Sequence, residues 1–320
     1  MERFQKPILL SILAGIGLYL GAMFLGDFHA TREAILEVGI VGWIVILGLS
    51  LFNYALRYWR WEWYLQKLAQ KPVPHRMHLA YYFCGFALST TPGKAGETVR
   101  ALYLKRHGIS YANTLSTFFV ERFLDLLSIV LISSAAAVLF DGYGPVVVIT
   151  GLVVFGSLPL LHSPALLRFL DAGPTRYSGK IGAGLKHLGE LLKSSAMLLK
   201  NRELFVGLLS GVIAWLAEAV GFWFLLHILG QDVSMLMAIS IYGVAVLVGA
   251  ISFLPGGLGS TEAVMSLLLI SLGVDKSVAL AATLICRIAT LWFAVFMGII
   301  VAGVLAMRGV TPLPGDEVKV

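Results

Sequence analysis

Two polar, glycine-rich stretches interrupt long apolar segments of this chain: Thr90-Thr-Pro-Gly-Lys-Ala-Gly-Glu97 and Leu254-Pro-Gly-Gly-Leu-Gly-Ser-Thr-Glu262. Proline ends a helix because it lacks an amide donor, and glycine permits a sharp reversal of the chain. Non-helical backbone at membrane depth persists only where protein or a water-filled cavity surrounds it. Each stretch could therefore join two spanning helices or form the turn of a re-entrant hairpin. The turn residues are Pro92, Gly93 and Gly96 in the first stretch and Pro255, Gly256, Gly257 and Gly259 in the second.

The composition of the whole chain excludes a soluble, fibrous or disordered protein. Hydrophobic residues make up 58% of the 320 residues and charged residues 13%, and the mean hydropathy is +0.86. A soluble domain carries about a quarter charged residues. The apolar residues form unbroken runs of about 20, unlike the alternating segments of about ten residues in outer-membrane barrels. The sequence therefore predicts an all-α polytopic membrane protein.

The distribution of basic residues decides how the chain crosses the membrane. Six apolar runs could span it, at about 7–26, 37–56, 111–140, 144–162, 203–229 and 277–306. Lys and Arg are enriched in cytoplasmic loops. If both interrupted segments, 77–106 and 233–273, are re-entrant and the N-terminus is cytoplasmic, the 24 Lys and Arg residues face inward except Arg32, Lys276, Arg122 and Arg287. The sequence thus predicts six spanning helices and two re-entrant hairpins, in the cell inner (plasma) membrane with both termini cytoplasmic.

The predicted organisation is a single transmembrane domain, 1–310, with a polar cytoplasmic tail, 311–320. Residues 178–202 carry leucines at helical spacing, with Lys186, Lys193 and Lys200 recurring every seven residues on another face. This pattern is typical of an amphipathic helix in the cytoplasmic interface, although a basic solvated helix is the alternative. Trp59, Trp61 and Trp63 beside Arg57 and Arg60 are typical of an interfacial belt.

The two interrupted segments match each other, which predicts an internal repeat covering about 37–140 and 203–306. After the turns, the two copies keep a constant offset, with Glu97 matching Glu262, Gly108 matching Gly273 and Arg122 matching Arg287. Three spanning helices separate equivalent points, and an odd number inverts the second copy. Inverted repeats with broken helices are typical of many secondary transporters. A static scaffold, duplicated for packing alone, is the alternative.

Two arginines are predicted near the middle of the bilayer. Arg122 and Arg287 each lie about 11 residues into an apolar helix, which at ~1.5 Å per residue is close to the midplane of a ~30 Å hydrocarbon core. A charge there costs roughly 2.5–3.5 kcal/mol on insertion scales, so each arginine needs a partner. Arg122 has Glu121 and Asp125 on its own helix, and the expected partners of Arg287 are Glu262 and Glu218.

The same charges suggest a binding site, although salt bridges that only staple the hairpins are the alternative. The half-helices after each Pro-Gly turn would point free amide groups and positive dipole ends into the membrane. A lipid phosphate would be met there, with Lys94 and Arg100 close by. Glu97 and Glu262 could meet a cationic part of the headgroup. The expected ligand is therefore a phospholipid headgroup, zwitterionic or aminoacylated.

The motifs occur in a specific combination. Pro92-Gly-x-x-Gly-Glu-x-x-Arg100 is followed by Glu121-Arg122-x-x-Asp125, and Leu254-Pro-Gly-Gly-Leu-Gly-x-x-Glu262 is followed by Arg287. In this combination, and over nearly the whole chain, they resemble the transmembrane region of lysylphosphatidylglycerol synthase/flippase proteins. The resemblance implies a flippase that moves aminoacylated phosphatidylglycerol across the bilayer, while a separate soluble domain in that family performs tRNA-dependent synthesis.

The resemblance leaves the lipid open. Because the sequence ends at Val320 after a polar tail, we expect no synthase domain, and other phospholipids or polyprenyl-phosphate-linked lipids are alternatives. Membrane phospholipids are the expected partners, and a separate lipid-modifying synthase could be another. Gly17-x-x-x-Gly21 could pack helices within or between chains, so a homo-oligomer is a further expectation.

No arrangement of nucleophile and base, and no set of metal ligands, is evident in the sequence. We therefore expect no catalytic residue, no cofactor, no metal and no nucleic-acid partner. Two rival functions stay open at this point: a membrane enzyme acting on a lipid or polyprenyl phosphate, and a non-transporting membrane scaffold.

Overall fold

The computed structural model describes residues 28–69, 72–134, 144–163 and 179–310, together with Gly17, Leu139, 165–166 and 168–170. This described part is helical and contains no strand, so the chain is an all-α polytopic membrane protein, as predicted. Apart from Gly17, the predicted first span, 7–26, and the predicted tail, 311–320, lie outside it.

The first half of the described chain holds α2 (Phe28–Glu37), α3 (Gly39–Leu68), α4 (His75–Phe86), η1 (Pro92–Val99), α5 (Arg100–Leu104), η2 (Lys105–His107), α6 (Tyr111–Ser133) and α8 (Gly144–Leu161). The second half holds α10 (Gly179–Leu198), α11 (Asn201–Ile228), α12 (Met235–Ile251), η3 (Pro255–Gly257), α13 (Ser260–Ser271), α14 (Lys276–Arg287), η4 (Ile288–Trp292) and α15 (Phe293–Met307). The first three η elements are 3-10 turns, and η4 is a π-helical turn directly after Arg287.

Four segments of the described chain are long and apolar enough to cross a membrane: α3, α8, α11 and the continuous run from α14 to α15. They correspond to four of the predicted spans. A fifth predicted span, 111–140, corresponds to α6, which carries Glu121, Arg122 and Asp125 in its middle. These charges lower the mean hydropathy of α6, and neighbouring helices cover them.

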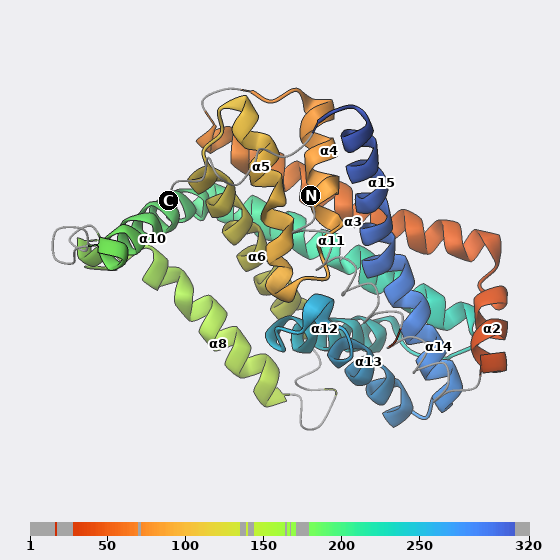
Figure 1. Ribbon diagram of the computed structural model, residues 1–320. Helices are drawn as coiled ribbons and strands as arrows, with labels where there is room; N and C mark the ends of the chain where they lie inside the picture. The colour runs from red at the N-terminus through yellow and green to blue at the C-terminus, as the bar shows by residue number, and fades with distance from the viewer. Residues whose placement is uncertain are drawn as a thin grey trace.

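The packing places α6 at the centre of the molecule. α3 and α11 lie side by side, and α6 packs against both (Figure 1). One apolar cluster gathers α2 with α11, α12, α13 and α14, and a second gathers α3, α4 and α5 with α15. A third joins α3 and α6 to α8 and the end of α10. Residues from the first two clusters line the cavity that is described below.

Both interrupted segments are helix–turn–helix units. α4 and α5 flank η1, and α12 and α13 flank η3, with each pair of helices in contact. The backbone leaves the helical region at Gly93 (φ 59°), Lys94 (φ 55°) and Gly256 (φ 62°). The chain therefore reverses at the predicted glycines. How deep these hairpins lie, and whether the two copies are inverted, stay predictions.

The structure corrects the interpretation of residues 57–63. The sequence placed Arg57, Arg60 and Trp61 in a cytoplasmic loop or interfacial belt, but α3 continues to Leu68 and all three side chains are buried. Both arginines can be buried because a carboxylate on α6 compensates their charge. Trp59 is the exposed exception, at 46%, and it stacks on Trp63. On which side of the membrane these two arginines lie stays a prediction.

The predicted amphipathic segment, 178–202, is largely the helix α10. It packs against α6 through its apolar side, where Leu198 and Leu199 are buried. Lys186, Lys193 and Lys200 are exposed. The helix is confirmed, and its place in the membrane interface stays a prediction.

Candidate functional site

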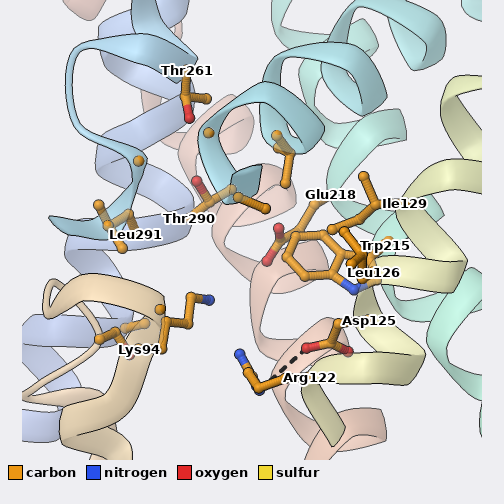
Figure 2. A pocket seen from close by; sticks show the side chains of 18 of the residues that line it. Lys94, Arg122, Asp125, Leu126, Ile129, Trp215, Glu218, Thr261, Thr290 and Leu291 are labelled. Carbon is orange, nitrogen blue, oxygen red and sulfur yellow. Dashed lines mark ion pairs between the residues drawn. The ribbon is translucent and has the colours of Figure 1, made fainter. Parts of the chain in front are cut away.

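A cavity of about 370 Å³ lies where the two hairpin turns approach α6 and α11 (Figure 2). Lys94 of the first turn and Gly256 of the second line it, together with Arg122 from α6, Glu218 from α11 and Arg287 from α14. In Figure 2 the Lys94 ammonium points into the open space from one side, and Glu218 lies across from it. Both copies of the predicted repeat thus contribute charged residues to one cavity.

The two hairpin turns touch at this cavity. A Cβ atom added to Gly256 would lie 3.4 Å from Thr90 Cα and 3.2 Å from Leu291 Cδ2. Residues with a side chain rarely adopt the positive φ that Gly256 has. Glycine at position 256 therefore allows the tip of the second hairpin to approach the first.

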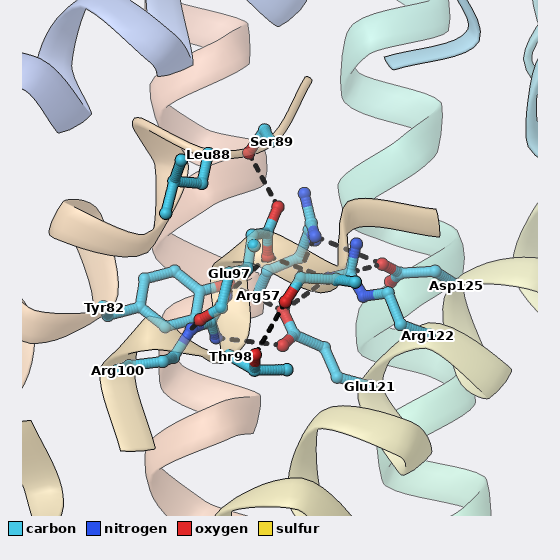
Figure 3. A network of polar contacts seen from close by, with 12 residues as sticks. Arg57, Tyr82, Leu88, Ser89, Glu97, Thr98, Arg100, Glu121, Arg122 and Asp125 are labelled. Carbon is cyan, nitrogen blue, oxygen red and sulfur yellow. Dashed lines mark hydrogen bonds and ion pairs between the residues drawn. The ribbon is translucent and has the colours of Figure 1, made fainter. Parts of the chain in front are cut away.

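An ion-pair network lies beside the cavity and joins α3, the first hairpin and α6 (Figure 3). Its four arginines and three carboxylates are Arg57, Arg60, Arg100, Arg122, Glu97, Glu121 and Asp125. Their side chains are at most 6% exposed, except that of Arg122 at 19%. Buried charges persist in proteins when they are paired, and each of these has at least one partner.

Arg100 holds the first hairpin against α6 and does not line the cavity. Its Nη2 lies 2.5 Å from Glu97 Oε2 and its Nη1 3.1 Å from Glu121 Oε2. The guanidinium also lies over the rings of Trp61 and Tyr82, 4.4 Å from each centroid. Arg100, Glu97 and Glu121 were all predicted site residues, and none of the three is among the residues that line the cavity.

Arg122 connects the network to the cavity. Its Nη2 lies 2.9 Å from Glu121 Oε1, 3.2 Å from Asp125 Oδ2 and 3.8 Å from Glu97 Oε2. The predicted partners on its own helix are therefore confirmed, and Glu97 from the hairpin approaches as well. Because Arg122 lines the cavity and is the most exposed member of the network, its guanidinium is the most accessible of the four to a ligand.

Arg287 is held by the second hairpin. Its Nε donates to Glu262 Oε1 at 2.8 Å, and its Nη2 donates to the Gly256 carbonyl at 2.6 Å. Glu262 Oε2 in turn accepts from the Gly259 amide at 2.8 Å, which caps α13. The predicted pairing of Arg287 with Glu262 is confirmed, and it matches the approach of Arg122 to Glu97 in the other copy.

Glu218, the other predicted partner of Arg287, is bonded elsewhere. Its Oε2 accepts from Tyr242 Oη at 2.5 Å. The side chain is buried and faces the cavity near Trp215 (Figure 2). Glu218 is therefore a carboxylate at the cavity wall that no arginine pairs with among the described residues.

Sequence reasoning missed three residues at this site: Arg57, Arg60 and Trp215. Arg57 and Trp215 line the cavity, and Arg60 donates to Asp125 Oδ1 at 2.5 Å. Two arginines three positions apart lie on one face of a helix, and this spacing beside Glu121 and Asp125 on another helix was the available signal. Nothing in the sequence distinguished Trp215 from other apolar residues of α11.

Comparison with known proteins gives one family match over most of the chain. The model described as the lysylphosphatidylglycerol synthase transmembrane region matches residues 12–298. A UPF0104 membrane protein of Pyrococcus horikoshii is 24% identical over 331 aligned positions, which cover 93% of this chain and 96% of that protein. The similarity to it therefore extends nearly from end to end.

Two shorter similarities have higher identity. A UPF0104 membrane protein of Methanothermobacter thermautotrophicus is 31% identical over 113 residues, which are 35% of this chain and 33% of that protein. A phosphatidylglycerol lysyltransferase of Staphylococcus aureus is 36% identical over 106 residues, which are 32% of this chain and 12% of that enzyme. This chain thus resembles a small part of the lysyltransferase.

Proposed function

This chain belongs to the lysylphosphatidylglycerol synthase transmembrane-region family, and on that premise we propose that it is a lipid flippase. It moves a phospholipid headgroup between the two leaflets through the cavity between the hairpins, while the acyl chains stay in the surrounding lipid. Family membership and the name of the Staphylococcus aureus relative support a role in membrane lipid metabolism. The movement itself is our inference.

One observation carries this proposal: a single cavity is lined by both hairpin turns and by cationic residues of both copies. Lys94 and Arg122 come from the first copy, and Arg287 comes from the second. A headgroup phosphate entering from either leaflet would meet guanidinium or ammonium groups at the same place, where charge-assisted hydrogen bonds are strong. Alternating movement of two hairpins around a fixed site is the mechanism that inverted repeats use in secondary transporters.

The test is headgroup translocation in proteoliposomes with Arg122→Gln. Arg122 is the residue to change because its carboxylate partners have other arginines. Without Arg122, Glu121 is still paired with Arg57 and Arg100, and Asp125 is still paired with Arg57 and Arg60. The protein should therefore still fold, whereas translocation of a fluorescent headgroup-labelled phospholipid should fall at least tenfold, since a hydrogen bond to a charged group is worth roughly 1.5–3 kcal/mol.

The matched control is Arg308→Gln, which removes an exposed arginine at the end of α15 and should leave the rate unchanged. A wild-type rate in Arg122→Gln would contradict the proposal. Lipid mass spectrometry of the same vesicles separates the rival enzymatic function, because a lipid-modifying enzyme would produce new lipid species and a flippase would not.

A further inference from the structure

The cavity wall contains hydrogen-bond donors that lack acceptors. Arg57 Nε, Arg122 Nε and Trp215 Nε1 are all buried and all belong to lining residues, and none has a hydrogen-bond partner in the part of the chain that the structure describes. Arg57 is 4% exposed and Trp215 is 7% exposed. Most buried N–H groups in native proteins are satisfied. Three lining residues therefore carry N–H groups that the surrounding protein does not satisfy, and the cavity has more donors than acceptors around it.

Lys94 adds a positive charge to the same wall. Its Nζ lies 5.9 Å from the centroid of the Trp215 ring. Among the described residues, no carboxylate lies within ion-pair distance of this ammonium group. Its backbone also has a φ of 55°, which side-chain-bearing residues rarely adopt. The chain thus places a lysine, and not the glycine that this conformation favours, at the cavity.

The carboxylates around the cavity are already occupied. Asp125 lies within 3.2 Å of nitrogen atoms of Arg57, Arg60 and Arg122. Glu262 is bonded to Arg287. Glu218 is therefore the remaining carboxylate at the described wall for a cationic group, and it already accepts a hydrogen bond from Tyr242.

The charges do not balance. The network contains four arginines and three carboxylates, and Lys94 adds a fifth positive charge. The pair of Arg287 and Glu262 is neutral. Even if Glu218 is ionised, the positive charges exceed the negative ones by one. An uncompensated charge is unfavourable in a membrane interior, so a ligand with a net negative charge would be favoured over a neutral or cationic one.

We propose that this cavity selects a lipid headgroup with a net negative charge, a phosphate ester without a compensating amine. The inference rests on the proposed function and narrows its substrate class. Arg57, Arg122 and Lys94 line the cavity, and the negative charge of the phosphate compensates the excess positive charge that they bring there. This differs from the zwitterionic or aminoacylated headgroup that the sequence suggested, because arginines occupy the carboxylates that would have bound an ammonium group.

The experiment is competitive lipid binding, measured by native mass spectrometry on the purified full chain. Phosphatidylglycerol, phosphatidylethanolamine and lysylphosphatidylglycerol with matched acyl chains are offered in equal amounts, with a polyprenyl phosphate in a parallel arm. Phosphatidylglycerol should be retained roughly tenfold over each amine-containing lipid, because the amine of each competitor would restore the uncompensated positive charge. Stronger retention of polyprenyl phosphate would also support a ligand with a net negative charge. It would identify a polyprenyl-linked lipid, and not a phospholipid, as the source of the phosphate. Equal retention of lysylphosphatidylglycerol would overturn the inference.

Variants at position 94 test the assigned residue. Lys94→Gln should lower the preference for phosphatidylglycerol roughly tenfold. Lys94→Arg keeps the positive charge and should keep the preference of the wild-type protein. Lys276→Gln, which removes an exposed lysine at the start of α14, should leave it unchanged. A wild-type preference in Lys94→Gln would overturn the role of Lys94 in the proposed site.

A translocation assay with the same lipids separates this inference from the proposed function. Equally fast movement of lysylphosphatidylglycerol and phosphatidylglycerol would overturn the charge selectivity and leave the flippase intact. Selective binding of phosphatidylglycerol without translocation of any lipid would overturn the flippase and leave the site intact.

Discussion

Each hairpin carries a matching glutamate, Glu97 or Glu262, that faces a matching arginine on the helix after it, yet the two glutamates are held differently. In the first hairpin, Glu97 is bound by Arg100 and approached by Arg122, within a network that spans three elements. In the second, Glu262 is bound by Arg287, and backbone groups of the η3 turn and its flank complete the contacts of both residues. The first hairpin is thus fastened mainly by side chains and the second largely by its own backbone.

This difference has an energetic consequence. Removing one charge from a buried network leaves its partners uncompensated, which costs several kcal/mol. The pair in the second hairpin is smaller and slightly more exposed, with side chains of 9% and 10%. Moving the second hairpin away from Arg287 would break at least the ion pair with Glu262 and the hydrogen bond to the Gly256 carbonyl. Moving the first requires the rearrangement of several ion pairs at once.

The largest expected effect comes from Arg100→Met. This change removes the nearer of the two arginines at Glu97 and one partner of Glu121, and also the contacts with the Trp61 and Tyr82 rings. Loss of one member of a buried ion pair costs about 3–5 kcal/mol. We expect a loss of stability of that size, measured by denaturant unfolding of the protein in detergent micelles.

The control for this prediction is Arg106→Met, which removes an exposed arginine from η2, close in sequence to Arg100. Surface substitutions usually change stability by less than about 0.5 kcal/mol. If both variants lose the same stability, the first hairpin is not fastened by its network, and the contrast between the hairpins disappears.

An intermediate effect is expected for Arg287→Met. It removes the bond to Glu262 and the bond to the Gly256 carbonyl, so stability should fall by about 2–3 kcal/mol, less than for Arg100→Met. Glu262→Gln combined with Arg287→Met should recover about 1 kcal/mol relative to the sum of the single changes, because it removes the stranded charge. Unfolding of the four proteins in one detergent measures this coupling. Strictly additive losses would mean that the two residues act independently.

The features that the sequence predicted are those with local signals. Proline and glycine in Leu254-Pro-Gly-Gly mark a turn wherever they occur, and a lone arginine in an apolar run, such as Arg287, requires a carboxylate. The sequence named two candidate partners for Arg287, of which Glu262 is bonded to it and Glu218 is bonded to Tyr242. These predictions needed no knowledge of how distant helices pack.

The features that it missed depend on tertiary contacts. Arg57 and Arg60 mark the end of a span by the usual rules, because charged residues leave the membrane unless something pairs with them. The carboxylate that pairs with both, Asp125, lies on α6, more than sixty positions along the chain. The orphan indole N–H of Trp215 is likewise visible only when the cavity wall is assembled. Arg57 and Arg60, which only the tertiary structure brings to the site, therefore decide its net charge.

The smallest effect compares one glycine in each turn. Gly93 and Gly256 have nearly the same positive φ, 59° and 62°, so alanine should incur the same backbone cost at both, roughly 1 kcal/mol. Their surroundings differ. A Cβ at Gly93 meets nothing within 4 Å among the described residues, whereas one at Gly256 meets Leu291 Cδ2 at 3.2 Å and Thr90 Cα at 3.4 Å.

Gly256→Ala should therefore be less stable than Gly93→Ala by about a further 1 kcal/mol, the cost of a mildly overpacked contact. Gly93→Ala serves as the matched control, since it carries the backbone cost without the contact. Thermal unfolding of both variants in the same detergent measures the difference, which reports on the approach of the second hairpin's tip to Thr90 and Leu291. If the tips are apart in the most stable state of the protein, this excess vanishes, and the two variants unfold at the same temperature.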